Sequence, residues 1–102
     1  TGQPGEPSTA VRERVVAAHS IQIERQGVAN ARLEASGMKR HCRLRAEDES
    51  FVANAAQQLS LSPRGCQRVL KVARTIADLD GAKNIRQNHL AEAIGFRQPG
   101  RY

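Results

Sequence analysis

The residues best placed to do chemistry are three cations within one short stretch of the chain. Arg64, Arg68 and Lys71 lie in "LSPRGCQRVLKVARTIADLDG", residues 61 to 81, at intervals of three or four residues. At about 100° per residue they fall along one stripe of a helix. Guanidinium and ammonium groups in such a row can bind phosphate or another anion. A solvated helix face has the same pattern, so spacing leaves both interpretations open.

Arg64 differs from the other cations in lying at the predicted start of this helix. Ser62 can cap the helix, Pro63 fits its first turn, and Gly81 lies just past its end. A helix N-terminus favours anions, and a guanidinium there can hold a phosphate by paired hydrogen bonds. The same chemistry suits the recognition helix of a helix-turn-helix module, and spacing does not separate the two functions.

The remainder of this helix divides into a polar stripe and an apolar side. Thr75 and Asp78 continue the stripe, whereas Arg74 lies off its centre and is expected to matter much less for anion binding. Ile76 is expected to be enclosed. The predicted apolar side consists of Val69, Leu70, Val72, Ala73, Ile76 and Ala77.

A second group of cations, called the basic cluster here, surrounds His41. It consists of Lys39, Arg40, Arg43 and Arg45. These residues can neutralise nucleic-acid phosphates, although no stacking aromatic residues are interleaved with them. The alternative is a solvated face or a contact with a neighbouring domain. Both interpretations stay open.

Metal and thiol chemistry are not supported. His41 and Cys42 are adjacent, so they project from a helix in different directions, and a zinc site using both would require distortion. His89 is expected to have a packing or capping role. Cys42 and Cys66 lack C-x-x-C spacing and are predicted to be reduced, partly buried thiols. No metal is therefore predicted.

Composition indicates a single small basic domain. The chain has 102 residues, a net charge of +6 and only three aromatic side chains, with 39% apolar residues. A pI of about 10.4 permits a polyanionic partner without requiring one. Neither a run of about 18 apolar residues nor a secretory signal is present, so we expect a cytoplasmic protein without membrane contact.

The periodicity predicts an all-α fold, with four main helices and one short helix in a bundle-like arrangement. Residues 1–7 form a predicted linker or expression remnant, and residues 98–102 a tail. A first helix is expected over 8–26, with Val11, Val15, Ala18 and Gln22 on its buried face. The other predicted helices cover residues 38–44, 46–59, 62–80 and 87–97, and a connection with at most a short turn covers 27–37.

Four segments carry a resemblance to a known family. They are "VRERV" at 11–15, "IERQG" at 23–27, the stretch at 61–81, and "IRQNHLAEAIGFR" at 85–97. Residues 8–97 resemble the C-terminal helical domain of the magnesium-chelatase-like AAA+ ATPases, most closely the ComM/YifB branch. The third segment fills nearly every place of the family's L-S-x-R-x-x-x-R-x-L-x-V-A-R-T-I-A-D-L pattern. The implied fold is an α-helical lid that follows an ATPase core.

The resemblance also implies a function. Arg64 would be the sensor-2 arginine, which reaches the γ-phosphate of ATP bound to the core, and Arg68 would support the same nucleotide site. ATP and Mg²⁺ belong to the intact parent, because no phosphate loop occurs in these 102 residues and the fragment alone is expected to bind neither and to lack ATPase activity.

The same family suggests partners for the domain. These are the core of the same polypeptide and further copies in a homo-oligomeric ring, with DNA as a further candidate. The parent would be a ComM-like DNA motor of natural transformation or a chelatase-related ATPase. A free-standing helical DNA-binding module is the alternative.

Overall fold

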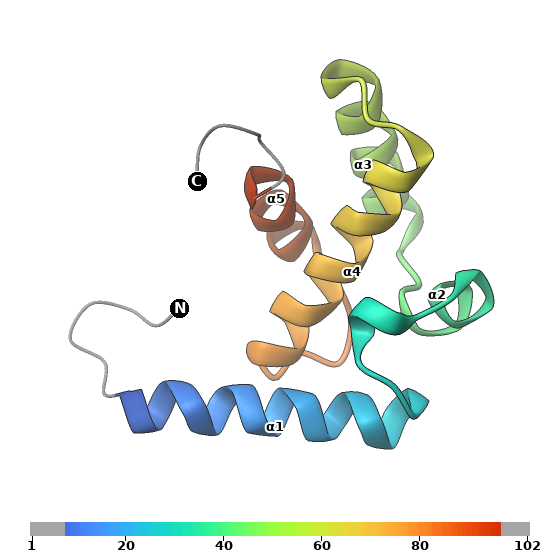
Figure 1. Ribbon diagram of the computed structural model, residues 1–102. Coiled ribbons are helices and arrows are strands. Elements are labelled where there is room, and N and C mark those ends of the chain that lie inside the picture. The colour runs from blue at the N-terminus through green and yellow to red at the C-terminus, as the bar shows by residue number, and fades with distance from the viewer. Residues whose placement is uncertain (1–7, 97–102) are drawn as a thin grey trace.

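The computed structural model describes residues 8–96, and all regular structure in this range is helical (Figure 1). The prediction of an all-α fold is confirmed. The predicted linker at 1–7, the tail at 98–102 and the predicted helix end at Arg97 lie outside the described residues. The elements are α1 (Ser8–Gln26), η1 (Asn30–Arg32), α2 (Ala35–His41), α3 (Ala46–Leu59), α4 (Pro63–Leu79) and α5 (Gln87–Phe96).

Local signals in the sequence explain where the longest helices begin and end. The Ser62 hydroxyl accepts a hydrogen bond of 3.0 Å from the Gly65 amide, and Pro63 occupies the first turn of α4. Gly27 and Gly81 have φ values of +81° and +73°, a left-handed conformation that glycine adopts without steric cost. These glycines follow α1 and α4, as the sequence predicts.

Helix α4 is the centre of the fold. It packs against α5, α1 and η1, while α3 packs against α5. In Figure 1, α1 lies crosswise beneath the C-terminal end of α4, and α2 projects to one side. The C-terminal turns of α4 are therefore packed against α1, whereas its cationic first turns lie away from this contact.

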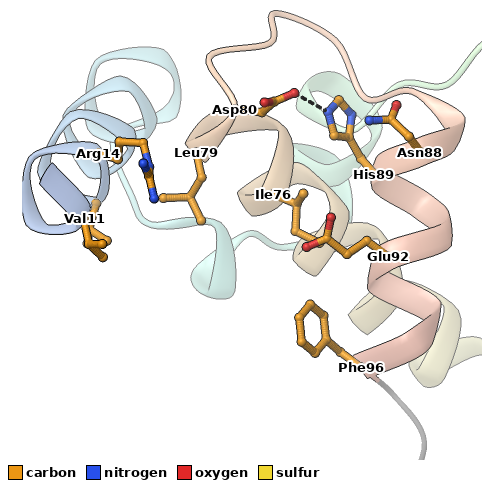
Figure 2. A pocket seen from close by; sticks show the side chains of 10 residues that line it. Val11, Arg14, Ile76, Leu79, Asp80, Asn88, His89, Glu92 and Phe96 are labelled. Atoms are coloured by element: carbon orange, nitrogen blue, oxygen red, sulfur yellow. Dashed lines mark hydrogen bonds and ion pairs between the residues drawn. The ribbon is translucent and has the colours of Figure 1, made fainter. Parts of the chain in front are cut away.

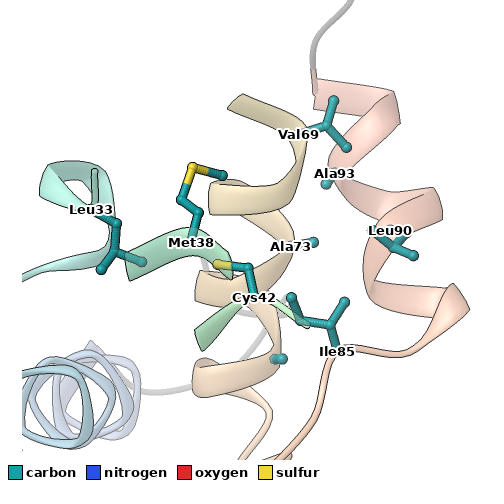
Figure 3. Packing of buried hydrophobic residues seen from close by; sticks show 9 residues of the cluster. Leu33, Met38, Cys42, Val69, Ala73, Ile85, Leu90 and Ala93 are labelled. Carbon is teal, nitrogen blue, oxygen red and sulfur yellow. The ribbon is translucent and has the colours of Figure 1, made fainter. Parts of the chain in front are cut away.

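The core is small and lies mainly between α4 and α5 (Figure 3). Ala73, Ala77 and Ala93 bring the two helix backbones close together, and Val69, Ile85 and Leu90 supply the larger side chains. A core of alanine and aliphatic residues follows from the scarcity of aromatic residues. Leu33, Met38 and Cys42 close this core from the η1–α2 side.

The sequence predictions for the buried face of α1 and for the bounds of the short helix were wrong in part. Val15 is 53% exposed and only Ala18 and Gln22 of α1 are buried, because α4 crosses α1 near its C-terminal half. The short helix spans Ala35–His41 instead of 38–44. Its early start places Gly37 against Leu33, where an added Cβ would lie 2.9 Å from the leucine Cδ2 atom.

Leu90→Ala should lower the free energy of unfolding by about 2–5 kcal/mol, because Leu90 is fully buried and the change leaves a cavity. Ile76 is only half-buried at the edge of a groove, contrary to the expectation that it is enclosed. Ile76→Ala should therefore cost clearly less. Urea unfolding followed by circular dichroism measures both, and equal losses would contradict the packing described for α4 and α5.

Candidate functional site

The two arginines at the start of α4 form an open cationic surface, called the cationic end of α4 here. Arg64 and Arg68 are exposed, and neither guanidinium makes a hydrogen bond or ion pair with another described residue. The nearest acidic residue on the same helix is Asp78, near its other end. Two unpaired guanidinium groups beside a helix N-terminus form a favourable environment for an anion.

The rest of the predicted stripe is not open. The Lys71 ammonium group donates to the Ala31 carbonyl at 3.1 Å, which ties α4 to η1. The Thr75 hydroxyl donates to the Lys71 carbonyl and accepts a 3.0 Å hydrogen bond from the side-chain amide of Asn30. The stripe predicted as one feature is therefore two: an open end at Arg64 and Arg68, and a packed end from Lys71 onward.

Asp78, at the packed end, is the centre of a buried polar network. Its carboxylate accepts hydrogen bonds from Arg25 at 2.8 and 3.2 Å and from the side-chain amide of Asn30 at 2.9 Å. Arg74 lies 3.0 Å from the same carboxylate. We call Arg25, Asn30, Arg74 and Asp78 the Asp78 clamp. It joins α1, η1 and α4 although its members lie up to 53 residues apart.

The clamp holds the Asp78 carboxyl in its charged form. Burial alone would raise the pKa of Asp78, but hydrogen bonds from Arg25 and Asn30, with the charges of Arg74 and Arg25, bring it below its ordinary value of 3.8. The network thus compensates the cost of burying a carboxylate.

Arg74, which was expected only to matter less for anion binding than the stripe, is a buried residue that holds the fold together. It is 3% exposed, and its guanidinium donates to the carbonyls of Ala82 at 3.1 Å, Lys83 at 3.2 Å and His41 at 3.4 Å. Burial lowers the pKa of Arg74, an effect that the charge of Asp78 opposes. The four-residue spacing of Arg74 and Asp78 is the sequence signal that could have indicated this pair.

The basic cluster is partly neutralised within the fold. Arg45 lies 3.2 Å from Asp48 and 3.7 Å from Glu47, and Asp48 is fully buried. The other three cations, on α2 and the segment after it, are exposed and make no ion pair with a described residue. They are Lys39, Arg40 and Arg43. No interaction joins them to the cationic end of α4, so the two groups are separate surface features of the described chain.

A groove of about 760 Å³ lies between the N-terminal half of α1, the end of α4, and α5 (Figure 2). His89 forms part of its wall and is 3% exposed. Its Nδ1 atom accepts a 2.9 Å hydrogen bond from the Arg86 amide, so the proton is on Nε2, which lies 3.2 Å from Asp80. Both ring nitrogens are engaged, and the predicted capping role is confirmed.

No group of three or more histidine, cysteine or acidic side chains with metal-binding geometry occurs within residues 8–96. Both ring nitrogens of His89 are engaged in hydrogen bonds, so neither is available as a metal ligand in this conformation. The described residues thus offer no metal centre.

Cys66 should react with an alkylating reagent faster than Cys42. Both thiols are free, as predicted, but Cys42 is buried whereas Cys66 is half-buried. Burial raises the pKa of Cys42, although Arg74 and Arg25 oppose this effect, and so lowers its reactive thiolate fraction. Timed alkylation followed by peptide mass spectrometry measures both rates. Equal rates in the folded protein, or only one thiol after unfolding, would contradict this description.

Comparison with known proteins establishes the family. Residues 5–97 match the family described as "Magnesium chelatase, subunit ChlI C-terminal", and the chain belongs to this family. Among its relatives, Competence protein ComM of Haemophilus influenzae is 48% identical over 97 residues, covering 95% of this chain and 19% of the relative. The uncharacterized protein YifB is 45% identical in Salmonella typhimurium and 44% in Escherichia coli, over 91% and 92% of this chain.

The domain corresponds to one part of these larger proteins. The chain spans about a fifth of the length of the curated relatives that it matches, 18% of one YifB and 19% of the other. The matched residues include all five α-helices of the described structure. Within residues 8–96, no helix is long and apolar enough to cross a membrane.

Proposed function

We propose that this chain is the sensor-2 lid domain of an AAA+ ATPase, and that Arg64 contacts ATP bound by a core domain of the same polypeptide. The observation that carries the proposal is the guanidinium of Arg64 in the first turn of α4, which is exposed and makes no ion pair with a described residue. An arginine in this position can bind a phosphate oxygen without first breaking an internal ion pair. Membership of the chelatase C-terminal family supports the proposal.

The described residues fit a nucleotide anion in charge and accessibility. Arg64 and Arg68 lie one turn apart, and the first turn of α4 contains no acidic side chain to compete for them. ATP with Mg²⁺ would supply the transferable phosphoryl group and the metal. Arg64 would orient and neutralise the terminal phosphate, while Arg68 would hold the same anion from the next turn.

The nucleotide preference of the full-length protein tests this proposal. Because Arg64 is proposed to contact the γ-phosphate, Arg64→Ala should weaken ATP binding while leaving ADP binding nearly unchanged. Fluorescent ATP and ADP analogues, titrated in the presence of Mg²⁺, measure both dissociation constants. Lys83→Ala, which removes another exposed cation, is the matched control. Equal losses for ATP and ADP would place Arg64 away from the γ-phosphate.

A second function is favoured by the basic cluster. Lys39, Arg40 and Arg43 are exposed and make no ion pair with a described residue. One relative bears the name "Competence protein", which fits the proposal that the parent acts on DNA. If the cluster binds duplex phosphates, the affinity of this chain should fall steeply with salt, and the triple alanine variant should bind more weakly with a shallower salt dependence. Binding that the triple variant retains in full would exclude the cluster.

A further inference from the structure

The buried residues of helix α1 lie in its C-terminal half. Of its 19 residues only Ala18 and Gln22 are buried. Toward its N-terminus, Val11 and Val15 line the groove that separates α1 from α5 (Figure 2). Contacts further along the helix therefore help to determine the direction in which this half of α1 points.

Those contacts are predominantly polar and directional. Arg25, in the last two turns of α1, makes two hydrogen bonds to Asp78 and a third, of 3.0 Å, to the Asn30 side chain. The Gln22 side chain accepts a 3.0 Å hydrogen bond from the backbone amide of Asn30, and Gln26 donates one of 2.7 Å to the Asn30 side-chain oxygen. A bidentate guanidinium–carboxylate pair restricts orientation more tightly than apolar contacts of the same area.

The α4 side of the clamp is itself firmly held. Arg74, one turn before Asp78, donates to carbonyls in two other segments, His41 at the end of α2 and Ala82 and Lys83 before α5. Ala73 and Ala77, on the same part of α4, pack in the hydrophobic core. Asp78 therefore presents a fixed carboxylate to which Arg25 attaches α1.

We infer that the Asp78 clamp sets the direction of α1 relative to α4, and that Arg25 and Asp78 are positioning residues for the nucleotide contact made by Arg64. The inference rests on the proposed function, in which the ATPase core precedes α1. At 1.5 Å per residue, the 14 residues from Asp78 to Arg64 span about 21 Å. A tilt of about 10° at the clamp would move the start of α4 by roughly 4 Å, and misplacement by 1 Å can cost about a hundredfold in rate.

The direction of α1 can be measured in the 102-residue chain. Spin labels at Glu13→Cys and Ala91→Cys, both exposed in the native protein, report the separation of α1 from α5 when Cys42 and Cys66 are replaced by alanine. The unmodified clamp should give one narrow distance distribution. Arg25→Gln should broaden or shift it.

A second variant at Arg25 and a control variant outside the clamp complete the distance measurement. Arg25→Lys keeps the positive charge beside Asp78 but loses the bidentate geometry, so it should broaden the distribution less, and it carries the test if Arg25→Gln does not fold. Arg32→Gln removes an exposed arginine outside the clamp and should change nothing. A distribution that stays narrow and unshifted in folded Arg25→Gln or Arg25→Lys would overturn the inference.

ATP turnover of the full-length protein distinguishes this inference from the proposed function. Arg25→Gln should lower kcat about tenfold or more, with a smaller change in KM, and Arg25→Lys should restore part of the loss. If Arg64→Ala abolishes turnover while Arg25→Gln leaves it intact, the positioning role is refuted and the sensor-2 role stands. If Arg64→Ala leaves turnover intact, the sensor-2 role fails, and the positioning role fails with it.

Discussion

Arg64→Ala in the full-length protein should lower ATP turnover by about a hundredfold or more at saturating ATP and Mg²⁺. Removing a cation directed at a transferring phosphoryl group typically has an effect of this order, because such a cation stabilises the charge that develops in the transition state. The stability of the 102-residue chain should change by less than about 0.5 kcal/mol, since the Arg64 guanidinium is exposed and unpaired among the described residues. Steady-state phosphate release and urea unfolding measure the two effects.

The controls for this prediction follow from the structure of α4. Arg74 is unsuitable, because its buried guanidinium holds three backbone carbonyls and its loss would disturb the fold. Lys83→Ala removes an exposed cation and should leave turnover unchanged. If Arg68→Ala abolishes turnover while Arg64→Ala does not, the sensor-2 position lies one turn later. If both variants are silent, the cationic end of α4 is a solvated surface.

Asp78→Asn should lower the free energy of unfolding by about 3–5 kcal/mol near neutral pH. The variant leaves the buried Arg74 and the half-buried Arg25 without their shared counter-charge, and breaking a buried pair from one side has a cost of this size. Glu34→Gln, which changes an exposed carboxylate, should cost less than about 0.5 kcal/mol. A loss below about 1 kcal/mol for Asp78→Asn would show that the clamp contributes little to stability.

The destabilisation by Asp78→Asn should also depend on pH. The pKa of Asp78 is lower in the folded protein than its ordinary value of 3.8, so the folded state favours the charged carboxylate. This stabilisation is complete well above pH 4 and is lost as the pH falls through the folded pKa. Urea unfolding between about pH 6.5 and pH 2.5 should therefore show the two proteins converging in acid. A constant difference would contradict the assigned charge state.

Helix ends were predictable from sequence because their signals are local. Ser62 caps α4, Pro63 occupies its first turn, and Gly27 and Gly81 follow α1 and α4 in left-handed conformations. Each of these signals acts within a few residues of the helix end. The capping role of His89 was predictable for the same reason, since its partner amide lies only three residues away. These features require no knowledge of how the helices pack.

Packed polar residues were not predictable in the same way. Arg74 and Asp78 look like surface residues, because charged side chains are seldom buried without partners. The partners Arg25 and Asn30 lie 53 and 48 residues from Asp78, and no periodicity indicates that they meet. The exposure of Val15 has a related origin, because the position at which α4 crosses α1 decides which part of the apolar face is covered.

The most direct measurement is an experimental structure of the full-length protein with Mg²⁺ and a non-hydrolysable ATP analogue. We expect the Arg64 guanidinium to lie about 2.7–2.9 Å from an oxygen of the γ-phosphate, the distance of a charge-assisted hydrogen bond. The bonds between Arg25 and Asp78 should be intact in the same structure. A γ-phosphate bound by other cations, with Arg64 in solvent, would contradict the proposed role of this domain.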